Sequence, residues 1–187
     1  MISEKQRSAE AACEYVKDGM IVGLGTGSTA EFAVKKIGEL VRNGLSIRGI
    51  PTSDATKILA ESEGIPLIDF SETMSIDLTI DGADEIDANL NMIKGGGAAL
   101  LREKIVASAS REEIIIVSGS KLVQQLGAFP LPVEVIPFGW QVVFNQLESL
   151  QGNPELRLKQ GQPSVTNQGN FIVDCHFRKI ENPEQLE

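Results

Sequence analysis

Short apolar runs alternate with amphipathic helical patterns along the first two-thirds of the chain. The apolar runs, which predict buried strands, cover residues 20–24, 47–50, 66–70, 76–80 and 114–117. The helical patterns cover residues 4–17, 28–41, 52–64 and the stretch that follows the glycines at 95–97. Continuous apolar strands separated by helices are typical of a parallel sheet covered on both faces. Residues 1–130 are therefore predicted to form a Rossmann-like, doubly wound α/β domain with a mostly parallel sheet.

The pattern changes at FPLPVEVIPFGW, residues 129–140, where three prolines interrupt it. Beyond this point, a strand is predicted at 133–136, a helix at 139–150 and a strand at 155–158. The stretch SVTNQGNFIVDCHF predicts a hairpin that turns at residues 167–170. Together these elements predict a second, smaller α+β domain over residues 131–187.

Composition and charge argue against several classes of protein. The 187 residues carry a formal net charge of -9, so no basic excess is available to neutralise a nucleic-acid backbone or an anionic membrane surface. No apolar run reaches the length of a membrane span, and the polar N-terminus lacks the apolar core of a signal peptide. The two cysteines, Cys13 and Cys175, have no metal-type spacing, which favours a reduced, cytoplasmic protein. A small anionic ligand remains compatible with this charge.

The first candidate site follows the first predicted strand, in the stretch IVGLGTGSTAEF. Its glycines match the dinucleotide pattern G-x-G-x-x-A, but the second strand ends at Pro51, where that fold places an acidic residue for the ribose. The spacing of Ser28 and Glu31 matches a capping box and predicts a helix start there. Three hydroxyls beside such a helix start suit a phosphate or a carboxylate, and they belong to Thr26, Ser28 and Thr29. A tight turn that binds nothing is the alternative.

Two further loops follow predicted strands, the acidic loop IDGADEID and the glycine-rich loop in MIKGGGAALLREKI. Asp81 comes directly after a buried strand, so its carboxylate is expected at the carboxyl edge of the sheet, where open parallel sheets bind ligands. Asp84, Glu85 and Asp87 complete the acidic loop, which lacks the residue order of a calcium loop; a solvated turn is the alternative. Lys94 precedes three glycines whose amides could form an anion-binding nest.

Glu103 lies in the first turns of the helix after the glycines, close in sequence to Leu101, Ile105 and Val106. Apolar surroundings would raise the pKa of this carboxyl group and make it a better base, whereas an exposed helix glutamate is the alternative. Lys121, after VSGS, is either a phosphate ligand or a surface lysine. The single histidine, at 176, supports neither a serine–histidine triad nor a typical zinc site.

Five motifs stand in the order and spacing of the A-type ribose-5-phosphate isomerases, which the chain resembles over essentially its whole length. The motifs are GLGTGST, DGADEID, MIKGGGAALLREKI, SGSKLV and FPLPVEVIPFGW. The resemblance implies reversible conversion of ribose 5-phosphate to ribulose 5-phosphate in the pentose phosphate pathway and the Calvin cycle. It implies no metal and no organic cofactor, and it implies a homodimer or homotetramer.

The resemblance also implies a role for each motif residue. Glu103 would be the general base that moves a proton between C2 and C1 through a cis-enediolate, while Lys94 and the glycine amides would stabilise the oxyanion. Asp81 and Asp84 would contact the sugar hydroxyls, and Asp81 would also assist ring opening. Lys5 would reach the phosphate. The other substrate-binding positions are Thr26, Gly27, Ser28, Thr29, Gly82, Ala83, Gly95, Gly96, Gly97 and Lys121.

The C-terminus departs from the family pattern, because members normally continue for some tens of residues beyond ENPEQLE with a helix and a final strand. Without those elements, the apolar face of the hairpin would lack some of its partners, and a sheet edge would be open to exposure. The residues concerned are Phe171, Val173 and Phe177.

Other functions predict different features of the sequence. A sugar-phosphate sensor would keep the phosphate loop without the base, and an NAD-dependent oxidoreductase would bind nicotinamide. A sugar-phosphate deaminase would typically bring a catalytic histidine to this region, and none precedes residue 176. A pure interaction module is the remaining alternative.

Overall fold

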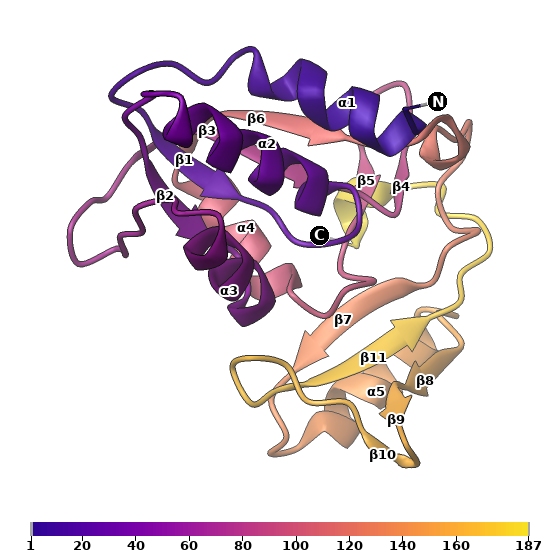
Figure 1. Ribbon diagram of the computed structural model, residues 1–187. Coiled ribbons are helices and arrows are strands. Elements are labelled where there is room, and N and C mark those ends of the chain that lie inside the picture. Colours follow the sequence, from indigo (N-terminus) through magenta and orange to yellow (C-terminus); the bar gives the residue numbers. More distant parts are fainter. Residues whose placement is uncertain (1, 187) are drawn as a thin grey trace. The chain divides into compact units, whose positions relative to one another are not determined.

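The computed structural model describes residues 2–186, which fall into two compact units (Figure 1). The first unit comprises Met1–Gly82 and Leu101–Gly119, and the second comprises Ala83–Leu100 and Ser120–Glu187. The chain therefore leaves the first unit after the acidic loop begins, and it returns there for one helix and one strand. This grouping differs from the predicted division at residue 130, which stays a prediction.

The first unit is built on a parallel sheet with the strand order β2-β1-β3-β6. The strands are β1 (Ile21–Leu24), β2 (Arg48–Pro51), β3 (Ile76–Gly82) and β6 (Ser110–Ile116). This confirms the predicted doubly wound α/β fold with a parallel sheet. The run at 66–70 is not a full strand as predicted, because only Leu67 bridges to Gly49 before Asp69 turns the chain by accepting the N–H of Ser71.

The helices of this unit are α1 (Glu4–Cys13), α2 (Ala30–Arg42), α3 (Asp54–Ser62) and α4 (Leu100–Ser108). The first predicted helix is four residues too long, because the N–H groups of Glu14 and Tyr15 already bond to the carbonyls three residues earlier, as in a tight terminal turn. The predicted capped helix at α3 is confirmed, since the Ser53 hydroxyl accepts the N–H of Thr56 at 3.0 Å.

The two faces of the sheet bury different side chains. On one face, Val22 and Leu24 of β1 belong to a core with Val34 and Ile37 of α2. On the other face, Val106 of α4 packs with Ile50 and Ile76, and partly buried side chains surround them. Because successive strand residues point to opposite faces, the short apolar strands serve both cores at once.

At Gly23 the first strand packs closely against β3 and α4. A Cβ atom at Gly23 would lie 1.9 Å from the Thr79 hydroxyl and 2.7 Å from a methyl group of Val106. The strand therefore needs a glycine here because of close packing between strands and helix, and its backbone conformation does not require one.

The second unit contains an antiparallel sheet with the order β7-β11-β8 and one covering helix (Figure 1). The elements are β7 (Leu131–Val135), α5 (Trp140–Ser149), β8 (Pro154–Leu156) and β11 (Phe171–Cys175). β7 and β8 flank β11, so the β7-α5-β8 connection leaves a gap that the later strand fills, which is a split βαβ motif. The predicted α+β character of this region is confirmed.

Short elements complete the second unit. β4 (Glu85–Ile86) pairs with β5 (Met92–Ile93), and β9 (Leu158–Lys159) pairs with β10 (Gln162–Pro163). Two 3-10 turns, Gly119–Lys121 and Pro183–Gln185, add single turns. None of the helices described between residues 2 and 186 has the length and apolarity needed to cross a membrane.

The apolar face of the predicted hairpin is better covered than the sequence suggests. Val173 is 0% exposed, and Phe171 and Phe177 are partly buried in a cluster with Phe144 and Leu147 of α5. Helix α5 packs on this side of the sheet and buries Val173 fully, whereas Phe171 and Phe177 are only partly buried.

The close packing at Gly23 predicts a large effect of one methyl group on stability. Gly23→Ala is expected to destabilise the protein by about 1–3 kcal/mol or more, because the added Cβ overlaps Thr79 and Val106. Thermal or urea unfolding measures this loss. Gly119→Ala is the matched control, because the nearest atom to a Cβ there is 3.9 Å away. Equal stability of both variants would contradict the packing argument.

Candidate active site

Two predicted loops meet where the winding of the first sheet reverses. The crossover from β1 leads to β2 on one side, and the crossover from β3 leads to β6 on the other, so the carboxyl ends of β1 and β3 are neighbours at the switch point. Open α/β sheets bind ligands at this position. The loop Gly25–Thr29 follows β1, and Asp81 and Gly82 end β3. These two loops therefore occupy the expected ligand edge of this unit.

The Asp81 carboxylate connects these two loops. Its Oδ1 accepts the N–H of Thr26 at 3.1 Å and the N–H of Gly82 at 2.7 Å, and the residue is 1% exposed. A Cβ at Gly25 would lie 2.3 Å from Asp81 Oδ1, so the first loop needs glycine there to admit the carboxylate. The predicted proximity of Asp81 to the first loop is a feature of the structure.

A cluster of buried hydroxyl side chains forms hydrogen bonds to the first loop. The Thr26 hydroxyl lies 2.7 Å from that of Thr52, 2.9 Å from that of Ser53 and 3.1 Å from that of Thr56. Thr52 and Thr56 also donate to the carbonyls of Leu24 and Gly25, each at 3.0 Å. Sequence reasoning missed this cluster, although three hydroxyl residues within the five positions after β2, namely Thr52, Ser53 and Thr56, were the available signal. The Thr26 hydroxyl therefore bonds within the protein and helps to fix the loop.

Ser28 has a different partner from the one its spacing predicts. Its hydroxyl accepts a hydrogen bond from Lys5 Nζ at 2.7 Å, and the helix begins at Ala30 after Thr29, whose side chain makes no capping bond. The predicted capping box of Ser28 and Glu31 is therefore wrong. The structure instead brings together two predicted phosphate-site residues, Lys5 and Ser28, at the N-terminal end of α2. Gly27 beside them has φ +112°, a conformation that favours glycine.

The other carboxylates of the acidic loop also accept backbone N–H groups. Asp84 Oδ2 accepts the N–H of Gly96 at 2.7 Å. The Glu85 carboxylate, 4% exposed, accepts the N–H groups of Gly127 at 2.7 Å and Phe129 at 2.6 Å. These bonds rule out a simple solvated turn for the loop.

Asp87 ends the acidic loop and is bound in the same way as the other carboxylates. The side-chain amide of Asn91, with the N–H groups of Asn91 and Asn89, holds the pKa of Asp87 below its usual range. Asp87 therefore fixes the turn between β4 and β5.

The glycine loop is tightly enclosed. A Cβ at Gly96 would lie 2.6 Å from Asp84 Oδ1 and 2.9 Å from the Phe129 ring, and Gly95 has φ +101°. Both positions therefore require glycine, as the close-approach interpretation of the sequence predicts. Arg157 Nη1 donates to the carbonyls of Gly95 and Gly96 at 3.2 and 3.1 Å. Sequence reasoning missed Arg157, since nothing in its local pattern indicates this contact.

Glu103 lies on α4 and is 5% exposed, so the alternative of an exposed helix glutamate is wrong. The prediction that Glu103 has apolar surroundings from its own helix is only partly right. Val106, one turn further along, is buried, but Leu101 and Ile105 are 36% and 47% exposed, because residues two apart on a helix point in different directions. A buried glutamate is rare in proteins unless it is paired or functional.

Two predicted lysines lie in the second unit. Lys94 follows β5 and is partly buried. Lys121 Nζ lies 5.2 Å from the centre of the Phe129 ring, a cation–π contact that orients this side chain.

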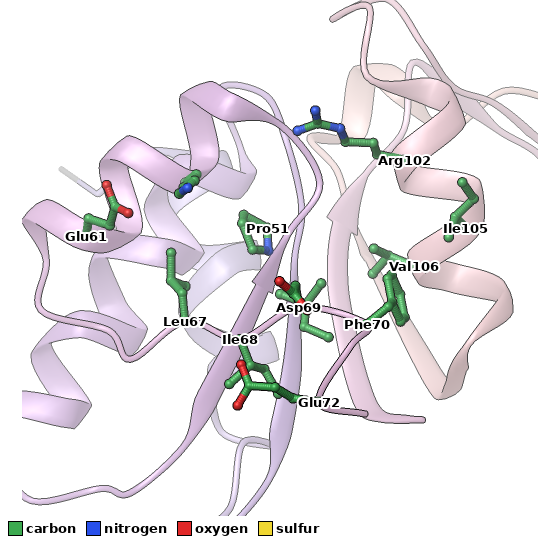
Figure 2. Close-up of a pocket in the computed structure, with 12 residues that line it drawn as sticks. Pro51, Glu61, Leu67, Ile68, Asp69, Phe70, Glu72, Arg102, Ile105 and Val106 are labelled. Carbon is green, nitrogen blue, oxygen red and sulfur yellow. The ribbon is translucent and has the colours of Figure 1, made fainter. Parts of the chain in front are cut away.

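A cavity of about 520 Å³ opens beside α4 in the first unit (Figure 2). Arg102, Ile105 and Val106 line it on α4, Phe70 lies beside Val106, and Pro51 lies across from the helix. The predicted site residues are not among its lining residues, so this cavity differs from the candidate site at the strand ends.

Both cysteines are free and buried. Burial raises the pKa of Cys13 to about 12 and that of Cys175 to about 11. The thiols are therefore protonated near neutral pH and unsuited to nucleophilic catalysis. Among residues 2–186, no group of three or more His, Cys, Asp or Glu side chains is arranged to hold a metal ion.

The parallel sheet, with two of the predicted loops at its switch point, defines a doubly wound α/β protein. Residues 48–187 match the family profile of ribose 5-phosphate isomerase A, also called phosphoriboisomerase A. The chain belongs to this family, whose members are isomerases that interconvert ribose 5-phosphate and ribulose 5-phosphate.

Individual relatives support this membership over nearly the whole chain. Ribose-5-phosphate isomerase A of Listeria monocytogenes is 54% identical over 188 residues, which cover 100% of this chain and 84% of the relative. A D-ribose-5-phosphate isomerase solved in complex with phospho-erythronic acid superposes with a TM-score of 0.95 at 40% identity, covering 98% of this chain and 82% of that one. Ribose 5-phosphate isomerase A of Methanocaldococcus jannaschii superposes with a TM-score of 0.94 at 41% identity, covering 98% of this chain and 83% of that one.

The hydrogen bonds of the buried Glu85 carboxylate predict that this residue stabilises the fold and takes no part in catalysis. Glu85→Gln is expected to lower the free energy of unfolding by about 2–4 kcal/mol, because one of the two N–H donors then faces an amide NH2 group and the other keeps only a neutral acceptor. Denaturant unfolding measures the change. Glu155→Gln serves as the control, since the Glu155 side chain is 71% exposed. Similar losses in both variants would contradict the assignment.

Proposed function

We propose that Glu103 is the general base of the isomerisation of ribose 5-phosphate. It would take the proton from C2 of the open-chain aldose and deliver it to C1, while the hydroxyl proton of O2 moves to O1 and the carbonyl shifts from C1 to C2. The observation that carries this assignment is the burial of Glu103, 5% exposed, at the start of the helix that follows the glycine loop. A carboxylate that is shielded from water and held on a helix is suited to repeated proton transfer.

The phosphate of the substrate would bind at the loop Gly25–Thr29. Lys5 Nζ and Ser28 Oγ are already 2.7 Å apart beside the N-terminal end of α2. A lysine, a hydroxyl and the N–H groups of the first helical turn are the donors that a phosphate dianion requires. Binding at this inert end would position the reacting carbons. Thr26, Gly27 and Thr29 would contribute through the backbone of the same loop, and Lys121 would add a second cation.

The sugar end would contact the acidic and glycine loops. Asp81 and Asp84 are three residues apart, so their Cα atoms are within about 11 Å of each other by chain length alone. Their carboxylates would accept the sugar hydroxyls, along with the backbone of Gly82 and Ala83, and Asp81 would assist ring opening. Lys94 and the amides of Gly95–Gly97 would stabilise the enediolate oxygen. The bonds of Asp81 to Thr26 and of Asp84 to Gly96 support these roles, because they fix both carboxylates.

The reaction would need no metal or organic cofactor, and the protein would work in the cytoplasm as a homodimer or homotetramer. The unpaired cysteines fit a reducing compartment. The exposed apolar side chains around the start of α5 fit an assembly, since Ile136 is 69%, Phe138 95% and Val142 62% exposed.

Removing the base tests the catalytic assignment. Glu103→Gln is expected to lower kcat by about 10³-fold, with ribose 5-phosphate still bound, because the amide cannot take the C2 proton. Ketose formation from ribose 5-phosphate, measured in EDTA, reports both the base and the independence from metal. Glu155→Gln should keep full activity. Undiminished turnover by Glu103→Gln would remove Glu103 from this role, and loss of wild-type activity in EDTA would refute the cofactor assignment.

The exposed apolar cluster predicts a subunit interface. Phe138→Asp is expected to shift the protein toward the monomer. Burying the charged carboxylate in a subunit interface is unfavourable, and the favourable burial of the phenyl ring is lost. Light scattering after size-exclusion chromatography measures the mass. Tyr15→Asp is the control, since Tyr15 is 60% exposed on the first unit. An unchanged mass for Phe138→Asp would place any interface elsewhere.

A further inference from the structure

Arg157 joins two parts of the second unit that are far apart in sequence. It lies between β8 and β9, and its guanidinium forms a two-point pair with Asp174 of β11, with Nε 2.8 Å from Oδ2 and Nη2 2.5 Å from Oδ1. Both side chains are 19% exposed. The remaining terminal nitrogen, Nη1, donates to the carbonyls of Gly95 and Gly96, which are 62 and 61 residues earlier in the chain.

These two hydrogen bonds determine the direction of the neighbouring N–H groups. The described chain contains no cis peptide bond, and in a trans peptide the C=O and N–H groups point in opposite directions. Because the Gly95 carbonyl points to Arg157, the N–H of Gly96 points away from it. The 2.7 Å bond from that N–H to Asp84 Oδ2 agrees with this direction. By the same rule, the Gly96 carbonyl points to Arg157 and the N–H of Gly97 points away from it.

Two successive N–H groups on one side of a loop form a concave site for negatively charged oxygens. Asp84 Oδ2 already accepts the first of these donors, the Gly96 N–H. We propose that Arg157, held by Asp174, is a positioning residue that fixes the Gly95–Gly97 peptides, so that the Gly97 N–H is directed at the enediolate oxygen of the substrate while Asp84 holds the Gly96 N–H. This inference rests on the proposed function of the glycine loop in stabilising that oxygen. It gives Arg157 a role that depends on its planar, forked guanidinium.

The glycine loop needs such an anchor because its sequence provides little rigidity. Three consecutive glycines sample many backbone conformations, and Gly95 at φ +101° and Ala98 at φ +62° adopt unusual ones. Donors that stabilise a transition state are effective only when their direction is fixed before the reaction. Arg157 supplies this constraint from the carbonyl side, and Asp84 supplies it from the N–H side.

Asp174 makes the anchor specific to arginine. A carboxylate bound to Nε and Nη2 fixes the plane of the guanidinium, so that Nη1 is presented to both carbonyls. Lysine at this position would keep the charge, but its single ammonium cannot hold Asp174 at two points and reach both carbonyls at once. The pair is therefore expected to act as one unit.

Kinetics of Arg157→Met, Arg157→Lys and Asp174→Asn test the proposal. Each variant is expected to lower kcat by on the order of 10- to 100-fold, less than the loss of a whole oxyanion donor, with KM for ribose 5-phosphate within about threefold of wild type. Phospho-erythronic acid, whose carboxylate resembles the enediolate, should lose affinity in step with kcat/KM. The double variant of Arg157→Met and Asp174→Asn should be no slower than Arg157→Met alone.

Thr166→Val is the matched control for stability within the same unit. It removes buried hydrogen bonds to Glu134 and Asn170 without touching the glycine loop. It should lower the melting temperature but leave kcat unchanged. An equal fall in kcat for Thr166→Val and Arg157→Met at matched stability would show a merely structural role and overturn the proposal.

A second measurement keeps the test independent of turnover. Hydrogen exchange of the Gly96 amide should be at least about tenfold faster in Arg157→Lys. The hydrogen bonds from Arg157 to the Gly95 and Gly96 carbonyls are then lost, and the Gly96 N–H opens more often from Asp84. Unchanged kcat and unchanged exchange in the Arg157 and Asp174 variants would overturn the inference, while a large loss in Glu103→Gln would leave the proposed function intact. Full activity of Glu103→Gln would instead refute the proposed function.

Discussion

The structure depends on one recurring interaction, a carboxylate that accepts backbone N–H groups from a loop distant in sequence. Asp81, Asp84 and Glu85 each bind such a loop, and Asp87 closes its own turn. A charged acceptor makes these bonds about twice as strong as bonds between neutral groups. One short acidic segment therefore fixes the loop after β1, the glycine loop and the loop around Phe129. The protein places its negative charges where they hold the backbone together.

The sheet topology explains why this segment can reach so many loops. β3 lies next to β1 at the switch point, so the residue that ends β3 meets the loop that ends β1. The chain then passes directly into the second unit, where the next carboxylates hold other loops. Gly25 and Gly96 complete the arrangement, because each gives a carboxylate room against the backbone. Glycine and aspartate thus work in pairs, and neither residue alone would fix the loop.

The sequence predicted the fold class, the four strands of the parallel sheet and the three loops, because apolar runs and glycine clusters are local signals. The apolar run at 66–70 is the exception, since it forms no full strand. It failed where the partner is distant. Ser28 has the spacing of a helix cap, yet Lys5 binds it, and Arg157 has no local feature that indicates the carbonyls of Gly95 and Gly96. The helix neighbours of Glu103 were likewise a poor guide to its burial, because Leu101 and Ile105 are exposed and only Val106 is buried. Local patterns identify elements, whereas the contacts that orient a side chain come from tertiary structure.

A lysine and a peptide N–H differ in how strictly they must be oriented to stabilise an oxyanion. A lysine such as Lys94 attracts an oxyanion from many directions, because its charge is nearly a point. A peptide N–H is a dipole, and its attraction falls steeply when its direction is wrong. If the enediolate is stabilised mainly by glycine amides, the catalytic effect depends on how firmly those peptides are held. Glycines restrict the backbone least, so the rigidity of this loop has to come from side chains on both sides of it. Asp84 and Arg157 occupy these two sides.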